Sequence, residues 1–457
     1  MSALLRNVIV CAVGALCAVG TAEEPVDLDI VNLLRDEGFH RSDIMDTIKH
    51  MTDVIGPRIT NSPQQREAAE WTRQSLQNWG LENAALEEWG DFGRGWSFTR
   101  CDVQMVEPMR VPLFALPKAW TPGTDGPVRG EVIIAKIEEE EDFEEFRGKL
   151  EGKFVRVSDI RDVGIDDDDA MFQRYDADDL CRLQDFPIPD GKEPSWMEGY
   201  KKRLKFSKQL RVFWLEEKVL ALLELSSRDA GVIRVTGNRA YGIGEEPGPL
   251  QLAMITEHYN RLMRFVNDDK RVELIIDVKS AFHEDDPKGY NVIAEISGTS
   301  KKREVVMLGG HLDSWHTGTG ATDNASGVSV VMEAVRILKA IGIKPKRTIR
   351  IALWTGEEQG LLGSRGYVEK HFALRPETTD EEELKLPKWV RKTTWPLTTT
   401  QEHERLAAYY NLDNGSGRIR GIYTQENAAV KPIFEAWLKP FVDVGADTVS
   451  LRNTGST

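Results

Sequence analysis

Residues 304–315 read EVVMLGGHLDSW. The apolar run at 305–308 is typical of a strand that is buried on both faces of a sheet. Two glycines end the run, and His311 and Asp313 follow directly. In open α/β sheets, ligands bind beyond the carboxyl ends of the strands. The stretch therefore predicts a buried strand that brings an imidazole and a carboxylate to a ligand-binding edge.

Three other segments bring acidic side chains to the same kind of position. Residues 348–354 (TIRIALW) and 407–412 (AAYYNL) are predicted strands with carboxylates after them, and the glycine-rich stretch 318–327 (GTGATDNASG) carries one more. The carboxylates are Glu357, Glu358, Asp413 and Asp323. We therefore expect four segments of the chain to meet at one edge of the sheet.

The order of the predicted elements indicates the fold class. Strands are expected over 272–278 and 291–296, and a helix from about 326 to 340 has a clear apolar face. Strands that alternate with helices predict an α/β fold, with a mostly parallel, twisted sheet flanked by helices on both faces.

Composition also divides the chain into domains. Residues 117–130 are rich in proline and glycine, which indicates a boundary. Beyond it, short strands alternate with highly charged segments, so we predict an inserted β-rich domain over residues 120–250. The main domain then comprises residues 23–119 and 251–457.

The first 22 residues are typical of a secretory signal peptide. Arg6 precedes an apolar stretch at 8–19, and the small residues 20–22 form a cleavage site. We therefore expect a secreted protein, located in the periplasm or outside the cell. No later stretch is apolar enough to span a membrane. An exported location permits a disulfide between Cys101 and Cys181, but their spacing does not establish one.

The formal net charge of −15 bears on the partners of the chain. Nucleic-acid binding requires a basic face, so the charge argues against nucleic acid as a partner.

The predicted edge has the donors that zinc prefers, because zinc binds imidazole nitrogen and carboxylate oxygen. Two zinc ions about 3.5–4 Å apart need a carboxylate that reaches both ions. Asp323 suits this bridge because its loop is rich in glycine. His311 and Glu358 would complete the ligands of one metal, and Asp413 would serve the other.

Two acidic residues beside these ligands have other expected roles. Asp313 is placed to accept the N–H of the His311 imidazole and so to fix its tautomer. Glu357 stays free of the metal, and it can take a proton from the attacking water and return it to the leaving amine.

The sequence resembles the co-catalytic zinc exopeptidases, a family that includes leucyl aminopeptidases, glutamate carboxypeptidase and the carboxypeptidase Q type, which is the nearest in detail. The motifs are GGHLDSW (309–315), GATDNASG (320–327), ALWTGEEQGLLGS (352–364) and YYNLDNGSGRIRGIY (409–423). The resemblance implies a two-zinc hydrolase acting on peptide substrates, with His311, Asp323, Glu358 and Asp413 as ligands and Glu357 as the base. It also implies an inserted protease-associated-like domain and allows a homodimer.

One departure from the family pattern affects the second metal. The family uses a further histidine late in the chain, whereas the last histidine here is His403, before Asp413. We therefore expect a C-terminally truncated sequence that binds one zinc ion far better than two and has weak or no activity.

Three functions remain open from the sequence. The leading expectation is an aminopeptidase or dipeptidase that hydrolyses short peptides, and a carboxypeptidase would use the same site. A non-catalytic binding protein on a peptidase scaffold is the third, although the survival of Glu357 and of four ligands argues against it.

Overall fold

The computed structural model describes residues 24–163, 174–185, 196–413 and 417–454, and its chain forms two compact units. The larger unit comprises Glu37–Asp169 and Lys192–Ser416. The smaller unit comprises Met1–Asp36, Ala170–Gly191 and Gly417–Gly455. The predicted signal peptide at 1–22 lies outside the described residues. Within the described ranges, no helix combines the length and the apolar character that crossing a membrane requires.

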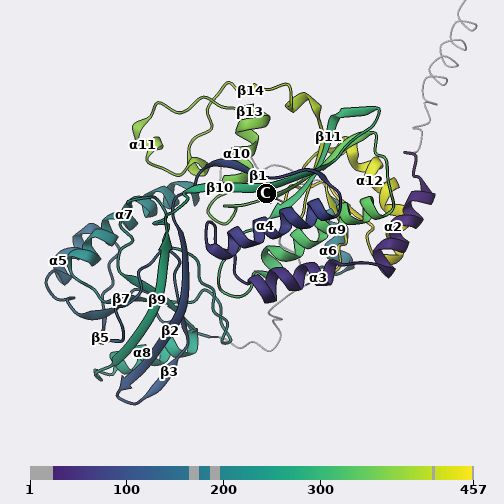
Figure 1. Cartoon of the computed structure of the whole chain (residues 1–457). Helices are drawn as coiled ribbons and strands as arrows, with labels where there is room; N and C mark the ends of the chain where they lie inside the picture. The colour runs from purple at the N-terminus through teal and green to yellow at the C-terminus, as the bar shows by residue number, and fades with distance from the viewer. Residues whose placement is uncertain (1–23, 164–173, 186–195, 414–416, 455–457) are drawn as a thin grey trace, which may run out of the picture. The chain divides into compact units, whose positions relative to one another are not determined.

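A five-stranded mixed sheet lies at the centre of the larger unit (Figure 1). Its order is β1 (Glu82–Asp91), β10 (Lys288–Ile296), β12 (Arg347–Trp354), β11 (Lys301–His311) and β15 (Leu406–Asn411). β11 lies between β12 and β15 and runs parallel to both, whereas β1, β10 and β12 pair antiparallel. The α/β class is confirmed, but the sheet is mixed rather than mostly parallel. The short connection 297–300 reverses the chain between β10 and β11, while a helical crossover separates β11 from β12.

Helices cover both faces of this sheet. α4 (Pro63–Asn78) and α9 (Ser326–Ala340) pack on one face, in a core that includes Val292, Ile351 and Leu353 of the strands. α10 (Leu362–His371) packs on the other face through Tyr367. α9 has the bounds expected from the sequence. α4 begins at Pro63, which occupies its first turn, and the Ser62 side chain caps the Gln65 N–H.

The larger unit also contains an eight-stranded sheet. Its order is β3 (Val111–Leu113), β2 (Gly95–Glu107), β9 (Glu273–His283), β5 (Val128–Ile134), β6 (Lys153–Arg156), β7 (Ala221–Leu225), β8 (Leu250–Met254) and β4 (Ala115–Pro117). α8 (Thr256–Asn267) packs in one of its cores, and α7 (Trp196–Glu216) packs in another through Phe213 and Trp214.

This second sheet takes strands from both sides of residues 120–250. β2 precedes that range and β9 follows it, so the strand expected over 272–278 belongs to the eight-stranded sheet. The inserted domain over 120–250 and its resemblance to protease-associated domains stay predictions.

Short elements complete the described residues. In the larger unit they are α3 (Ile44–Lys49), η1 (His50–Ile55), η2 (Glu140–Asp142), α5 (Phe143–Phe146), η3 (Ala321–Ala325), β13 (Ala373–Leu374), α11 (Glu381–Leu384), η4 (Lys388–Val390), β14 (Thr398–Thr399) and η5 (His403–Arg405). In the smaller unit they are α6 (Ala177–Leu183), β16 (Gly421–Tyr423), η6 (Ala428–Val430), α12 (Lys431–Leu438), η7 (Lys439–Val444) and β17 (Thr448–Ser450), while α2 (Leu28–His40) begins in this unit and ends in the larger one. Cys101 and Cys181 are both free.

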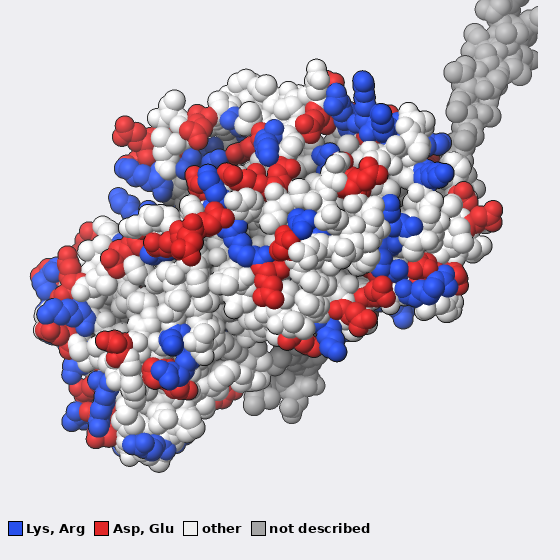
Figure 2. Space-filling view, in the orientation of Figure 1, with Lys and Arg blue, Asp and Glu red and all other residues white. Residues whose placement is uncertain are grey.

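Charged side chains are mixed over the face shown in Figure 2. Lys and Arg alternate there with Asp and Glu, and the basic side chains on that face do not merge into one continuous surface.

Candidate metal centre

The candidate site lies at the carboxyl ends of β11, β12 and β15. His311 is the last residue of β11, and its ring is buried, with 1% of the side chain exposed. Its register partner on β12 is Trp354, so the turn after β12 begins beside it. Asp413 comes two residues after the end of β15, directly after Leu412. Parallel neighbours thus end together and deliver their side chains to one point, as the sequence predicted.

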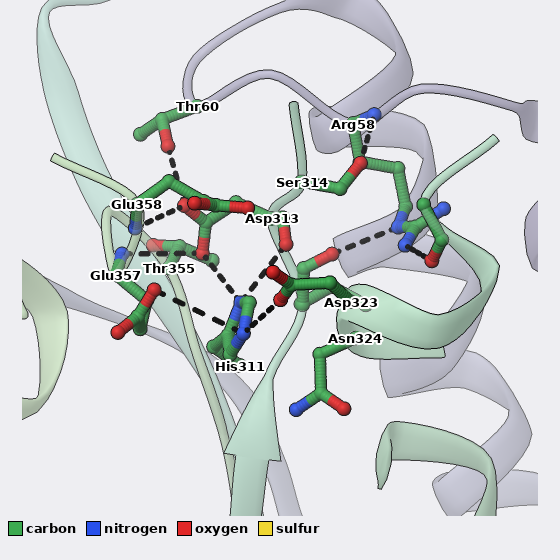
Figure 3. Close-up of polar contacts among 12 residues, drawn as sticks. Arg58, Thr60, His311, Asp313, Ser314, Asp323, Asn324, Thr355, Glu357 and Glu358 are labelled. Atoms are coloured by element: carbon green, nitrogen blue, oxygen red, sulfur yellow. Dashed lines mark hydrogen bonds and ion pairs between the residues drawn. The ribbon is translucent and has the colours of Figure 1, made fainter. Parts of the chain in front are cut away.

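Three ligand-type side chains converge there. The Nε2 atom of His311 lies 3.0 Å from Oδ1 of Asp323 and 3.2 Å from Oδ1 of Asp413. The ligand atoms of the three residues all lie within 4.8 Å of one another. Figure 3 shows Asp323 approaching the imidazole from the loop before α9. The buried Asn324 ties this loop to β15, because its Nδ2 donates to the carbonyl of Leu412.

The grouping of ligands differs from the sequence expectation in one respect. His311 was expected to share a metal with Glu358, leaving Asp413 for the other. In the structure, Asp413 and Asp323 lie beside His311, whereas Glu358 is not among the carboxylates within 4 Å of the ring. Both β12 and β15 flank β11, but Asp413 comes two residues after the end of β15, whereas Glu358 comes four residues after the end of β12.

The tautomer of His311 is fixed by a main-chain group. Nδ1 lies 3.0 Å from the carbonyl oxygen of Asp313, so Nδ1–H donates to it and Nε2 is the ring atom that faces Asp323 and Asp413. The sequence assigned this role to the Asp313 carboxylate, which is 3.7 Å away. That carboxylate is turned to the next strand end and accepts the N–H groups of Glu357 and Glu358, each at 3.2 Å.

Glu357 and Glu358 are held on the turn after β12. Oε2 of Glu357 lies 3.9 Å from Nε2 of His311. Burial raises the pKa of Glu357 to about 7, against the opposing effect of the His311 charge. Burial also raises the pKa of Glu358 to about 9, and the negative charge of Asp323 adds to it. The charges of the neighbouring carboxylates therefore add to the effect of burial on the pKa of both side chains of this turn.

The charge balance of the site fits a bound cation. Four carboxylates lie within 4 Å of the imidazole nitrogens, and burial opposes charging the ring. The hydrogen bonds of His311 with Asp313, Asp323 and Asp413 outweigh burial, so its pKa lies well above the usual value. Negative charge at this density needs a compensating positive charge, and nitrogen and oxygen donors suit zinc.

Arg58 is a site residue that sequence reasoning missed. It is fully buried, and in the described part of the chain its guanidinium donates to five main-chain carbonyls. The acceptors belong to Leu312, Met51, Gly56, Thr319 and Gly320. Burial lowers the pKa of Arg58 to about 10, while Asp313, Asp323 and Glu358 act against this shift. The available signal was one charged residue within an otherwise uncharged stretch, VIGPRIT at 54–60.

The loop between His311 and Asp323 is also attached to the eight-stranded sheet. The buried His316 donates from Nε2 to the carbonyl of Pro117 at 2.7 Å, and its ring packs against Trp96 and Phe98. The Oγ1 of Thr317 accepts from the Val235 N–H at 3.0 Å. The chain between the two candidate ligands is therefore held at several points.

The fold and the site together define a class of protein. Residues 291–451 match the sequence model described as peptidase family M28, and that range contains every candidate ligand. In fold, the chain is similar to the crystal structure of a peptidase M28 precursor from Shewanella amazonensis, with a TM-score of 0.60, 21% identity, and coverage of 93% of this chain and 82% of that one. It is also similar to BSAP, a zinc aminopeptidase from Bacillus subtilis, with a TM-score of 0.50, 18% identity, and coverage of 91% and 80%.

The chain is therefore similar to peptidase family M28 over residues 291–451. Among curated proteins it is related to carboxypeptidase Q of Mus musculus, with 26% identity over 325 residues, which is 71% of this chain. The chain spans 60% of the length of that relative.

Proposed function

We propose that this protein is a zinc-dependent exopeptidase that hydrolyses short peptides. The observation that carries the proposal is the convergence of His311, Asp323 and Asp413, whose ligand atoms lie within 4.8 Å of one another. Support also comes from the family M28 match, which covers all three residues.

The described side chains offer two positions of unequal quality for zinc. The first has three ligands, His311, Asp323 and Asp413. The second would use Asp323 as a shared carboxylate together with Glu358, whose pKa is raised by burial and further by the nearby negative charge of Asp323. Zinc bound there would lower the pKa of a water molecule and polarise the carbonyl of the scissile bond.

Glu357 is the proposed general base. Its carboxylate lies beside the ligand cluster without belonging to it, and its turn is fixed by the Asp313 carboxylate. Glu357 takes a proton from the attacking water and later returns it to the nitrogen of the leaving group. Its carboxamide variant, Glu357→Gln, keeps the shape of the side chain and removes this capacity.

The decisive experiment compares the zinc-loaded wild type with Glu357→Gln on an unblocked dipeptide. We expect the substitution to lower kcat by at least about 100-fold, as is typical when a general base is lost. Zinc binding should stay within a few-fold of the wild type. Equal kcat values for the two proteins would refute the assignment of Glu357. Absence of cleavage by both, with ligand binding unchanged, would instead favour a non-catalytic binding protein.

The terminus that the enzyme recognises is the finer part of the proposal. We favour an aminopeptidase or dipeptidase, and the alternative is a carboxypeptidase, the activity in the name of the curated relative. An N-blocked and a C-blocked dipeptide separate the two. Loss of cleavage on N-blocking alone supports the aminopeptidase, and loss on C-blocking alone supports the carboxypeptidase.

Export to the periplasm or the extracellular space is proposed from the signal peptide at 1–22. N-terminal sequencing of secreted protein should then begin at Glu23. A homodimer remains a prediction, which the molecular mass in solution would test.

A further inference from the structure

Three buried polar side chains form a line behind the turn that carries Glu357 and Glu358. Oγ1 of Thr60 lies 2.9 Å from Oδ2 of Asp313 and 2.6 Å from Oε1 of Gln359. Thr60 and Asp313 are fully buried, and Gln359 is 7% exposed. Thr60 precedes α4, while Asp313 follows β11 and Gln359 follows β12, so the line connects three separate segments.

The hydrogen-bond donors and acceptors in this line of side chains do not match. A threonine hydroxyl has one proton, yet both neighbouring oxygens are acceptors. The Nε2 of Gln359 is buried and has no hydrogen-bond partner in the described residues. The Asp313 carboxylate already accepts two backbone N–H groups, and a carboxylate oxygen is a stronger acceptor for the hydroxyl proton than an amide oxygen.

Turning the Gln359 amide by 180° removes this conflict, because oxygen and nitrogen exchange places without changing the shape of the group. Nε2 of Gln359 then donates to Oγ1 of Thr60, and the hydroxyl donates to Oδ2 of Asp313. The amide oxygen takes the place without a partner, and a bare carbonyl is the less costly group to leave there.

We propose that Thr60 and Gln359 are positioning residues of the exopeptidase site: Gln359 directs the Thr60 hydroxyl to the Asp313 carboxylate, which in turn fixes the turn bearing Glu357 and Glu358. The Thr60 hydroxyl occupies a lone pair of Oδ2 and restrains the rotation of the carboxylate. The carboxylate then holds the main-chain N–H of Glu357 through Oδ1 and that of Glu358 through Oδ2. The role rests on the proposed function, but the restraint on the turn does not.

The first test measures the restraint without any substrate or metal. Thr60→Val keeps the side-chain shape and removes the hydroxyl. We expect amide hydrogen exchange at Glu357 and Glu358 to become about tenfold faster, as for the loss of one hydrogen bond to a charged group. Thr60→Ser restores the hydroxyl and should return exchange to within about twofold of the wild type. Unchanged exchange in Thr60→Val, or equal acceleration in Thr60→Ser, would overturn the proposal.

The second test fixes the direction of the Gln359 amide. Gln359→Met has a similar length and can neither donate nor accept strongly. If Gln359 donates to Thr60, this variant loses a restraint and exchange at Glu357 and Glu358 accelerates. If the amide oxygen instead competes for the Thr60 proton, the same variant releases that proton to Asp313, and exchange stays equal or slows. The second result would overturn the assigned direction.

The third test connects the restraint to catalysis. For the zinc-loaded protein on an unblocked dipeptide, Thr60→Val should lower kcat about tenfold with KM nearly unchanged, and Thr60→Ser should recover most of the loss. Thr72→Val is the matched control, because among the described residues its buried hydroxyl donates only to the carbonyls of Ala68 and Ala69 within α4. A loss in the control equal to that in Thr60→Val would assign the effect to general stability.

The outcomes separate this proposal from the function on which it rests. A wild type that cleaves no peptide, with exchange responding to Thr60→Val as expected, would remove the exopeptidase function and leave the restraint. Full activity of Thr60→Val would remove the positioning role and leave the exopeptidase function.

Discussion

At the scale of single residues, the candidate centre depends on buried polar groups that are hydrogen-bonded to the segments around them. Arg58 is the clearest case, because within the described residues its guanidinium donates to five main-chain carbonyls, three of which lie in the segments around His311 and Asp323. It supplies a positive charge behind a cluster of carboxylates. Its removal would leave these carbonyls buried without donors.

Arg58→Met should therefore lower the free energy of unfolding by about 3–5 kcal/mol, the usual cost of breaking a buried charged network. Arg58→Lys keeps the charge but reaches fewer carbonyls, so its free energy of unfolding should lie between those of the wild type and Arg58→Met. Urea unfolding of the three proteins checks the order. A Met variant within about 1 kcal/mol of the wild type would contradict the prediction.

His316 makes a second residue-scale prediction, which concerns pH. Burial lowers its pKa to about 4, while the carbonyl of Pro117 favours the charged ring only weakly. In the unfolded chain the His316 ring is protonated as the pH falls through about 6.5, whereas in the native chain it is protonated only near pH 4. The His316 contribution to native stability is thus complete above pH 6.5 and is lost as the pH falls through this window, by roughly 3 kcal/mol in total.

His316→Gln should consequently flatten the fall of the unfolding free energy between pH 6.5 and pH 4. Urea unfolding at several pH values measures this slope. The exposed His403, changed to Gln, is the matched control. Equal slopes for His316→Gln and the wild type would show that the ring takes up its proton in the native state.

At the scale of elements, the loop between β11 and α9 determines the position of Asp323. Gly320 has a left-handed backbone, with φ at +63°. A Cβ atom there would lie 2.4 Å from Oγ of Ser314 and 2.9 Å from Nη2 of Arg58. The loop therefore needs glycine for both its backbone conformation and its close packing.

Gly320→Ala should weaken zinc binding by tenfold or more, because strain of roughly 1–3 kcal/mol would displace the loop that holds Asp323. Competition with a chelator measures the affinity. Gly318→Ala is the control in the same loop, since a Cβ atom there meets nothing within 4 Å. Equal affinities in the two variants would mean that the loop adapts without moving Asp323.

The strand ends were predictable from the sequence, and the lateral contacts were not. Apolar runs followed by His311, Glu357 and Asp413 placed all three at one sheet edge, because parallel neighbours end together. Which carboxylate lies beside His311 depends on the path of the chain after β12 and β15, and that path is a tertiary property. Arg58 and Thr60 belong to a loop without periodicity, so no local pattern pointed to their role. The antiparallel pairing of β10 with β12 likewise follows from one short connection.

At the scale of the whole molecule, one zinc position with three ligands predicts unequal binding of two ions. The first equivalent of zinc should raise the melting temperature, because a ligand at 100 times its Kd stabilises the native state by about 2.7 kcal/mol. The second equivalent should add little. Calorimetric titration and thermal unfolding measure both steps, and a chelator should reverse them. His311→Ala should abolish the first step. Two equivalents of equal affinity would contradict the prediction.

The position of Arg58 early in the chain, far from Leu312, has a consequence for synthesis on the ribosome. Its guanidinium donates to the carbonyl of Leu312, which lies 254 positions later in the chain. A nascent chain thus carries this cation through the synthesis of 254 further residues before the acceptors at Leu312, Thr319 and Gly320 emerge. Loop closure over this distance is slow compared with local helix formation. The catalytic edge is therefore expected to be among the last parts to assemble, which leaves early segments such as α4 dependent on chaperones until then.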